Sequence, residues 1–148
     1  MTVPGRIVAL DVGDERIGVA ASDPLGITAQ PRSVIVRRTP EQDADAICSE
    51  LVALGASALV VGLPLTNSGA IGHQAEKVLA FVDLLRSKLD IEIVMQDERF
   101  TTAVVARALS NAGTRRTRRK AIIDALAAQQ ILETYLARRS AAPPPGES

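Results

Sequence analysis

The sequence predicts an α/β fold: a mixed five-stranded sheet with helices on both of its faces. Three observations lead to this fold class. Three extended apolar runs open the chain, two further apolar runs each follow a segment with helical spacing, and two more helical segments come last. Antiparallel strands followed by β-α-β crossovers give a sheet of mixed strand direction, because crossover strands run parallel.

The three opening strands are separated by short connections. RIVALDV covers residues 6–12, RIGVAASD begins at residue 16, and RSVIVRR covers residues 32–38. The few residues between the first two runs favour a hairpin. The connection DPLGITAQP contains two prolines and a glycine, which interrupt regular structure and separate the second strand from the third.

The first helix has a start and a stop signal. Thr39, Pro40 and Gln42 have the spacing of a capping box with proline in the first helical position. We expect this helix to run to about residue 54 and to end at Gly55. The apolar run ALVVGLP over residues 58–64 then predicts a central strand that is buried on both faces.

The rest of the chain continues this alternation. Apolar spacing predicts a helix within residues 73–89, and IEIVMQ over residues 91–96 predicts the fifth strand. Thr101 or Thr102 would cap a helix that ends near residues 111–113, and the last helix should cover residues 120–139. We therefore expect one domain over residues 1–139 and a disordered Pro- and Ala-rich tail over residues 140–148.

Composition narrows the possible functions. The chain has 148 residues with 47% hydrophobic and 2% aromatic content, so little base stacking is available to a nucleic-acid partner. One Cys and one His exclude a disulfide framework and a thiolate metal cluster. No apolar run approaches the roughly 20 residues of a membrane helix, so we expect a cytoplasmic protein. Residues 1–98 carry 8 Lys/Arg against 14 Asp/Glu, and residues 99–148 carry 9 against 3, which indicates an anionic partner for the C-terminal part.

Three carboxylates stand at unusual places in this pattern. Asp11 continues the apolar face of the first strand, and Asp124 falls in the apolar stripe of the last helix. Glu98 directly follows the fifth strand. Each has a structural alternative: a turn aspartate at Asp11, an ion pair of Asp124 with Arg6 or Arg99, and a helix-dipole role for Glu98.

If the three acids converge on one point, they repel one another unless divalent cations hold them. Two Mg²⁺ or Mn²⁺ ions roughly 3.5–4 Å apart clamp the attacking and leaving oxygens in phosphoryl transfer, and these hard ions prefer oxygen ligands. The second of two Asp-Glu-Arg copies would thus supply Glu98, with Arg99 available to a phosphate. We interpret the first copy, residues 14–16, as a solvated hairpin turn.

A basic segment, TRRTRRK, precedes the helix that carries Asp124. A solvated loop is the common origin of such a segment, but its place before the acids favours contact with a nucleic-acid backbone. In the loop GLPLTNSGAIG, polar side chains could contact a phosphate, although a tight strand-to-helix connection needs similar residues. The predicted nucleic-acid contacts are Arg99, Arg115, Arg116, Arg118, Arg119 and Lys120, with Asn67 and Ser68 as phosphate contacts.

Four stretches together resemble the YqgF family of Holliday-junction resolvases, also described as pre-16S ribosomal RNA nucleases. They are DVGDERIGVAASDPLGITAQP, VVGLPLTNSGAIGHQAEKV, DERFTT and RKAIIDALAAQQILETYL, within residues 6–136. The resemblance implies a ribonuclease-H-like fold and metal-dependent cleavage of structured nucleic acid, with Asp11, Glu98 and Asp124 as metal-binding catalytic acids. This chain has Asp14 where the family usually has Thr or Ser.

Two other functions are compatible with parts of the sequence. A non-catalytic nucleic-acid-binding module would use the basic segment for affinity and its acids for structure. An actin-like phosphotransferase would use DVG as a phosphate loop, but that fold needs two such domains and a second D-x-G, and this chain has neither. The expected partner is structured RNA or branched DNA, not a membrane, and the protein would act as a monomer or a homodimer.

Overall fold

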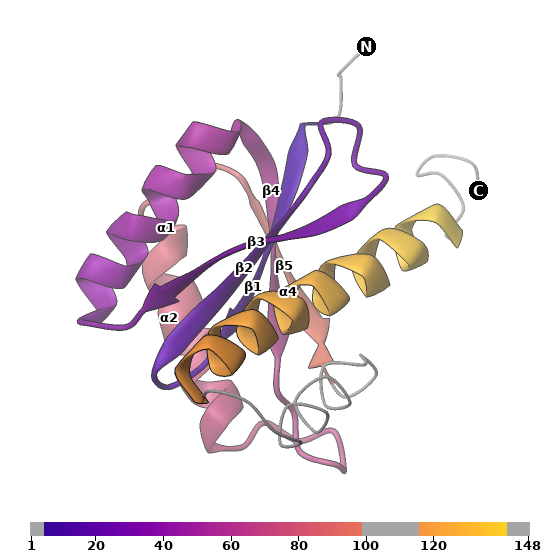
Figure 1. Ribbon diagram of the computed structural model, residues 1–148. Coiled ribbons are helices and arrows are strands. Elements are labelled where there is room, and N and C mark those ends of the chain that lie inside the picture. Colours follow the sequence, from indigo (N-terminus) through magenta and orange to yellow (C-terminus); the bar gives the residue numbers. More distant parts are fainter. Residues whose placement is uncertain (1–4, 99–115, 142–148) are drawn as a thin grey trace.

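The predicted mixed sheet is present in the protein, whose computed structural model describes residues 5–98 and 116–141 (Figure 1). Its strand order is β3-β2-β1-β4-β5. The strands are β1 (Arg6–Val12), β2 (Arg16–Ser22), β3 (Ala29–Val36), β4 (Ala56–Leu63) and β5 (Glu92–Asp97). The helices are α1 (Pro40–Leu54), α2 (His73–Arg86) and α4 (Arg116–Ala141). Strand β2 pairs antiparallel with β1 and β3, whereas β4 pairs parallel with β1 and β5.

Helices cover both faces of the sheet, as predicted. Alternate residues of a strand face opposite sides, so β1 contributes Val8 and Leu10 to one core cluster and Ile7 and Ala9 to the other. The first cluster lies under α1 and α2, and the second lies under α4, which crosses the opposite face in Figure 1. Asp11 has the parity of Ile7 and Ala9, which places it on the α4 face.

The predicted start and stop of α1 are confirmed. Thr39 is the N-cap, its hydroxyl accepts a hydrogen bond from the Gln42 amide at 3.1 Å, and Pro40 is in the first turn. Gly55 ends the helix with φ 62°, a left-handed conformation that glycine adopts without a Cβ penalty. This end leads directly into β4, so the cap also fixes where the central parallel strand begins.

Several element ends differ from the sequence-based prediction. Strand β3 begins at Ala29 rather than at residue 32 and includes Pro31. Proline lacks a backbone N–H, but β3 is an edge strand, and its register with β2 shifts between Val19 and Ala20, so the sheet accommodates the ring at a bulge. Strand β4 begins two residues earlier than predicted, and α2 ends at Arg86 before a turn that leads into β5.

The last helix is longer than predicted at both ends. The segment that we interpreted as a basic loop is largely helical, because α4 begins at Arg116 and ends at Ala141. Arginine and lysine are good helix formers, and no breaker follows Gly113 in this stretch. The helix predicted to follow Thr101 or Thr102 lies outside the described residues, as do residues 142–148, so the division into a domain over residues 1–139 and a tail stays a prediction. No helix among the described residues is long and apolar enough to cross a membrane.

Candidate functional site

Two of the three predicted acids are buried on the α4 face of the sheet, where β1 and β5 end. Asp11 is 6% exposed and Glu98 is 7% exposed. The parallel register pairs Leu10 with Val61, so one residue further Asp11 stands beside Gly62 of β4. A Cβ atom built on Gly62 would lie 3.5 Å from the carboxyl carbon of Glu98. Gly62 therefore lies beside both acids, Asp11 in the neighbouring strand β1 and Glu98 just after β5.

The third acid reaches this region because α4 approaches the sheet very closely. Gly18 pairs with Asp11 across the antiparallel β1–β2 ladder. A Cβ atom on Gly18 would collide with the backbone carbonyl oxygen of Asp124, so only glycine leaves room for the helix at this point. The backbone carbonyl of Asp124 thus packs on Gly18, the neighbour of Asp11 across the β1–β2 ladder, whereas the Asp124 side chain contacts Arg16.

The side chain of Asp124 is held by Arg16, so our interpretation of the first Asp-Glu-Arg copy as solvated is wrong for Arg16, whereas Asp14 and Glu15 are exposed as predicted. The Nε of Arg16 donates to the Oδ2 of Asp124 at 2.6 Å, and the two side chains are only 23% and 19% exposed. This contact raises the pKa of the Arg16 guanidinium above its ordinary value. The partners considered from the sequence were Arg6 and Arg99; Arg6 instead donates to the carbonyl of Leu54.

A sequence signal for Arg16 existed but was not used. A carboxylate in an apolar helical stripe needs a nearby cation, and a glycine inside a strand marks the close approach of another backbone. Arg16 lies two residues before Gly18 and so has the same strand parity. Together these points would have paired Arg16 with Asp124.

The turn that carries Arg16 is held by a hydrogen bond within the turn and by the side chain of Arg37, which directly follows β3. Within the turn, the Gly13 amide donates to the carbonyl of Arg16 at 2.9 Å. From the end of β3, the guanidinium of Arg37 donates to the carbonyl of Gly13 at 3.0 Å and also pairs with the buried Asp43 at 3.1 Å. Because Arg37 holds the turn in place, it positions Arg16, a role that the sequence analysis missed.

Asp14 attaches the same turn to α2. Its carboxylate accepts hydrogen bonds from Gln74 at 3.1 Å and from Lys77 at 3.4 Å. The Gln74 amide, and then the Lys77 ammonium, lower the pKa of Asp14. The Asp14 side chain is exposed and contacts α2. It therefore lies apart from the buried carboxylates of Asp11 and Glu98.

The described carboxylates do not form a three-membered metal cluster. No group of three or more His, Cys, Asp or Glu side chains in the described part of the chain is arranged to hold an ion. Asp11 and Glu98 nevertheless fit Mg²⁺ or Mn²⁺ by chemistry, because both are buried oxygen donors on one face of the sheet. Mg²⁺ is commonly bound through one or two carboxylates, with water and substrate oxygens completing its shell.

An unused hydrogen-bond donor lies at the same strand ends. Gln96 is 5% exposed, and among the described residues its amide nitrogen has no hydrogen-bond partner. It pairs in register with Gly62, so it faces the α4 side of the sheet, and Glu98 follows it two residues later, just beyond β5. A buried donor without a partner is costly to a fold, and such groups occur where a ligand or a water completes the bond.

The predicted phosphate contacts lie in a compact turn after β4. Asn67 and Ser68 are exposed, and the Ser68 hydroxyl lies 3.1 Å from that of Thr66. Thr66 also closes the turn through the Gly69 and Ala70 amides, with Gly69 at φ 87°. The nucleic-acid contacts stay predictions: Arg99 and Arg115 lie outside the described residues, and the side chains of Arg116, Arg118, Arg119 and Lys120 do too.

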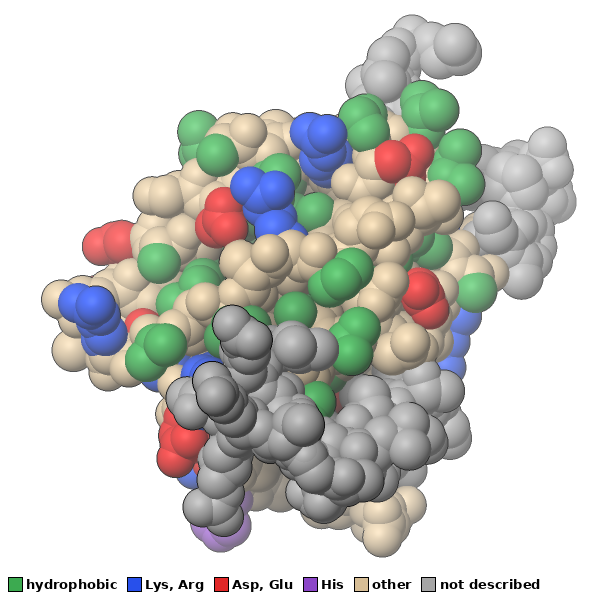
Figure 2. All heavy atoms as spheres, in the orientation of Figure 1, with side chains coloured by type: hydrophobic (Ala, Val, Ile, Leu, Met, Phe, Trp, Pro, Cys, Tyr) green, Lys and Arg blue, Asp and Glu red, His purple; other side chains and the backbone are tan. Residues whose placement is uncertain are grey.

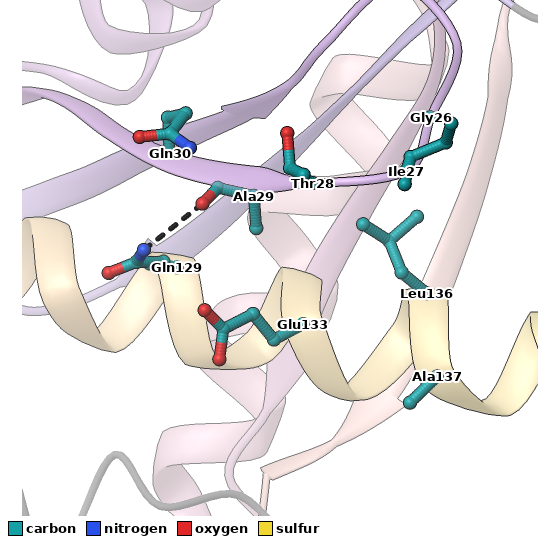
Figure 3. Close-up of a pocket in the computed structure, with 9 residues that line it drawn as sticks. All are labelled: Gly26, Ile27, Thr28, Ala29, Gln30, Gln129, Glu133, Leu136 and Ala137. Atoms are coloured by element: carbon teal, nitrogen blue, oxygen red, sulfur yellow. Dashed lines mark hydrogen bonds between the residues drawn. The ribbon is translucent and has the colours of Figure 1, made fainter.

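One surface hollow among the described residues lies apart from Asp11, Glu98 and Asp124. It has a volume of about 590 Å³ and lies between β3 and the C-terminal half of α4 (Figure 3). There the Gln129 amide donates to the carbonyl of Ala29 at 3.0 Å, and further along α4 Leu136 lies near Ile27. Leu136 is twelve residues beyond Asp124, about 18 Å along the helix axis at 1.5 Å per residue.

The face of the protein shown in Figure 2 carries mixed charge. Lys, Arg, Asp and Glu side chains are interspersed with apolar ones among the coloured residues, without a broad basic surface. The chain as a whole has 17 Lys and Arg and 17 Asp and Glu, and the basic residues are in excess only after residue 98. This excess makes residues 99–148 the part of the sequence from which we expect a basic surface for a nucleic-acid backbone.

Comparison with known proteins identifies the family. The RuvX family, described as Holliday junction resolvase, matches residues 5–138. A protein of Halothermothrix orenii named "Putative pre-16S rRNA nuclease" is 44% identical over 131 residues, which are 88% of this chain and 94% of that protein. A protein of Desulforudis audaxviator with the same name is 44% identical over 134 residues, 90% of this chain and 95% of that one.

A solved structure agrees on the fold. Thermus thermophilus RuvC in complex with a Holliday junction substrate superposes with a TM-score of 0.58, covering 95% of this chain and 99% of that one at 14% identity. At this identity the likeness concerns the ribonuclease-H-like fold alone. The match of the family model over residues 5–138 and the 44% identity to a relative show that this chain belongs to the RuvX family of nucleases.

Proposed function

We propose that the chain is a metal-dependent nuclease that hydrolyses phosphodiester bonds in structured nucleic acid, with Asp11 and Glu98 as its principal metal ligands. The observation that carries this proposal is that two buried carboxylates, Asp11 of β1 and Glu98 just after β5, both lie beside Gly62. Buried ionisable side chains on a protein surface edge gather at functional sites more often than elsewhere, which supports a site at these two acids.

The chain's own residues have separate tasks in this proposal. When bound, Mg²⁺ or Mn²⁺ would activate a water and stabilise charge on the phosphoryl oxygens. Asp11 and Glu98 bind and orient the ion, and Asp124 adds a ligand for a second one. The Gln96 amide donates to an oxygen of the substrate or of a water at the strand ends.

The basic start of α4 is the proposed path of the nucleic-acid backbone. Lys120 precedes Asp124 by one helical turn, about 6 Å along the axis, so the positive segment adjoins the acids. If the five Lys and Arg residues of TRRTRRK each met a phosphate of duplex DNA, the logarithm of the binding constant would fall with the logarithm of the salt concentration with a slope of about −4.5. Arg99, Asn67 and Ser68 would add contacts around the same strand ends.

The substrate is proposed from the relatives. Two proteins 44% identical to this chain carry the name of a pre-16S rRNA nuclease, which favours maturation of a ribosomal RNA precursor in the cytoplasm. The family description favours a four-way DNA junction. Cutting a two-fold symmetric junction on both strands would favour a homodimer, whereas trimming RNA suits a monomer.

The test compares wild type with Asp11→Asn on a precursor-rRNA fragment and on a four-way DNA junction, in Mg²⁺, in Mn²⁺ and with a chelator. We expect cleavage of one substrate that requires metal and is lost in the variant. Cleavage that continues unchanged in the chelator would contradict the proposal.

A second function is favoured by one observation, the engagement of Asp124 by Arg16. In a non-catalytic nucleic-acid-binding module this pair would be purely structural. Such a module would keep tight binding in the chelator and cut neither substrate. Replacing Arg115, Arg116, Arg118 and Arg119 with alanine would abolish its binding, whereas Asp124→Asn would change only stability.

A further inference from the structure

Arg37 holds the β1–β2 turn from the face of the sheet that α1 and α2 cover, opposite the buried acids. It directly follows β3 and pairs with Asp43 of α1. We propose that Arg37 is a positioning residue for cleavage, which acts by fixing the turn over residues 13–16. This turn joins the strand that carries Asp11 to the strand that begins at Arg16. The inference rests on the proposed nuclease function and adds to it an ion pair outside the group of acids.

Three hydrogen bonds connect Arg37 with the turn and with α1. Its backbone amide donates to the carbonyl of Glu15 at 2.9 Å. Its Nη1 donates to the carbonyl of Gly13 at 3.0 Å, and its Nε donates to the Oδ2 of Asp43 at 3.1 Å. Because a guanidinium is planar and its donors form a rigid fork, the last two bonds fix the Gly13 carbonyl relative to Asp43.

Asp43 and Phe81 in turn fix the guanidinium of Arg37. The Asp43 side chain is 2% exposed, and its Oδ1 accepts a hydrogen bond from the backbone amide of Arg38 at 2.9 Å. The Cζ of Arg37 lies 5.0 Å from the ring centroid of the buried Phe81, within the range of a cation–π contact. A buried carboxylate that loses its cation is costly to the fold, so we expect the pair to keep this one arrangement.

The turn connects this arrangement to both sides of the proposed site. Gly13 follows Asp11 by two residues, and its amide donates to the carbonyl of Arg16 at 2.9 Å. A Cβ atom on Gly13 would lie 2.8 Å from that carbonyl oxygen, so the turn is tightly closed. The side chain of Arg16 pairs with Asp124. A shift of the turn would therefore move the acids of β1 and α4 relative to each other, and a displacement of about 1 Å can slow catalysis by about a hundredfold.

A second ion pair between β3 and α1 provides a matched control. Arg32 lies 3.5 Å from Glu50, with side chains that are 41% and 27% exposed. The next residue, Ser33, pairs with Val19, which is three residues beyond the turn in β2. A change in this pair removes a contact between the same two elements but does not reach the turn.

The test compares cleavage by wild type, Arg37→Lys and Arg32→Lys at saturating Mg²⁺, at a temperature where circular dichroism shows all three to be folded. The substrate is whichever of the precursor-rRNA fragment and the four-way DNA junction wild type cleaves. Lysine keeps a positive charge beside Asp43, but it lacks the fork that also holds the Gly13 carbonyl. We expect Arg37→Lys to lower the maximal single-turnover rate by about tenfold or more, with the half-saturating substrate concentration within about twofold. Arg32→Lys should stay within about twofold of wild type in both quantities.

A double variant distinguishes positioning from a general weakening of the fold. If Arg37 acts through the turn, the variant with both Arg16→Lys and Arg37→Lys should cleave about as slowly as the slower single variant, because both changes disturb one element. Rate losses that multiply in the double variant would overturn the inference. A wild-type maximal rate in folded Arg37→Lys would overturn it too.

Should Arg37→Lys fail to fold, Asp43→Asn replaces it, with Glu50→Gln as its control. Asparagine keeps the volume of the side chain but removes the charge that holds the guanidinium, so we expect a smaller loss of maximal rate, in Asp43→Asn alone. Equal maximal rates in these two variants would contradict the inference. Failure of the nuclease proposal is distinct, because wild type would then cleave neither substrate, and the inference would fall with it.

Discussion

Substituting Gly18 with alanine tests the close packing that brings α4 and Asp124 to the sheet. The new methyl group would overlap the carbonyl oxygen of Asp124, a backbone atom of a 26-residue helix. Overpacking of a core costs about 1–3 kcal/mol, and retreat of the helix would also weaken the Arg16–Asp124 pair, a charged hydrogen bond worth about 1.5–3 kcal/mol. We expect Gly18→Ala to lower the free energy of unfolding by about 3–5 kcal/mol.

Urea denaturation followed by circular dichroism measures this loss. With a denaturant slope of about 2 kcal/mol per molar, the midpoint should fall by about 2 M. Gly62→Ala is the matched control, because its methyl group would meet the Cδ1 of Ile131 at 2.6 Å, the end of a side chain that can rotate. We expect the control to lose about 1 kcal/mol. Equal midpoints for the two variants would refute the packing of α4 on β2 described above.

Three further substitutions test separate features. Gln96→Met removes a buried donor without a partner at nearly constant side-chain volume, so the free energy of unfolding should rise by about 1 kcal/mol. A slower cleavage rate in the same variant would show that the Gln96 amide acts in the site. A lower free energy of unfolding would contradict the expectation. Thr39→Ala removes the N-cap of α1 and should cost about 1 kcal/mol in urea denaturation. The backbone amide of Thr28 lowers the pKa of Asp23, so its carboxylate stabilises the fold above the ordinary Asp pKa and loses this effect as pH falls through the lowered value. The difference in melting temperature between wild type and Asp23→Ala should therefore shrink between about pH 5 and pH 2; a difference that grows with acidity would contradict the assignment.

Local sequence signals predicted the ends of a helix well where a residue type has a single structural role, such as a capping hydroxyl or a left-handed glycine. Thr39 and Gly55 delimited α1 correctly, because a capping hydroxyl and a left-handed glycine act within a few residues. Pro31 misled us about the start of β3, because an edge strand does not need the N–H that proline lacks, and sequence alone does not say which strand lies at the edge.

The site was predictable only in part, because its contacts join distant parts of the chain. Periodicity alone placed Asp11 on a buried strand face, and the structure agrees. The partner of Asp124 is 108 residues away, and it depends on how closely α4 approaches β2 at Gly18. Arg37 donates a hydrogen bond to the carbonyl of Gly13. A bond from a side chain to a distant backbone oxygen leaves no pattern in the sequence from which it could be predicted.

Single-turnover cleavage by Asp11→Asn and Asp14→Asn at saturating Mg²⁺ is the most direct measurement of whether Asp11 belongs to a metal-dependent cleavage site. The two acids are three residues apart, but Asp11 is buried on the α4 face and Asp14 is exposed towards α2. We expect Asp11→Asn to fold but to cleave about a thousandfold or more slowly than wild type, a loss of roughly 4 kcal/mol in transition-state stabilisation. Asp14→Asn should cleave at a rate within about threefold of wild type. Full activity in a folded Asp11→Asn protein would contradict this role of Asp11.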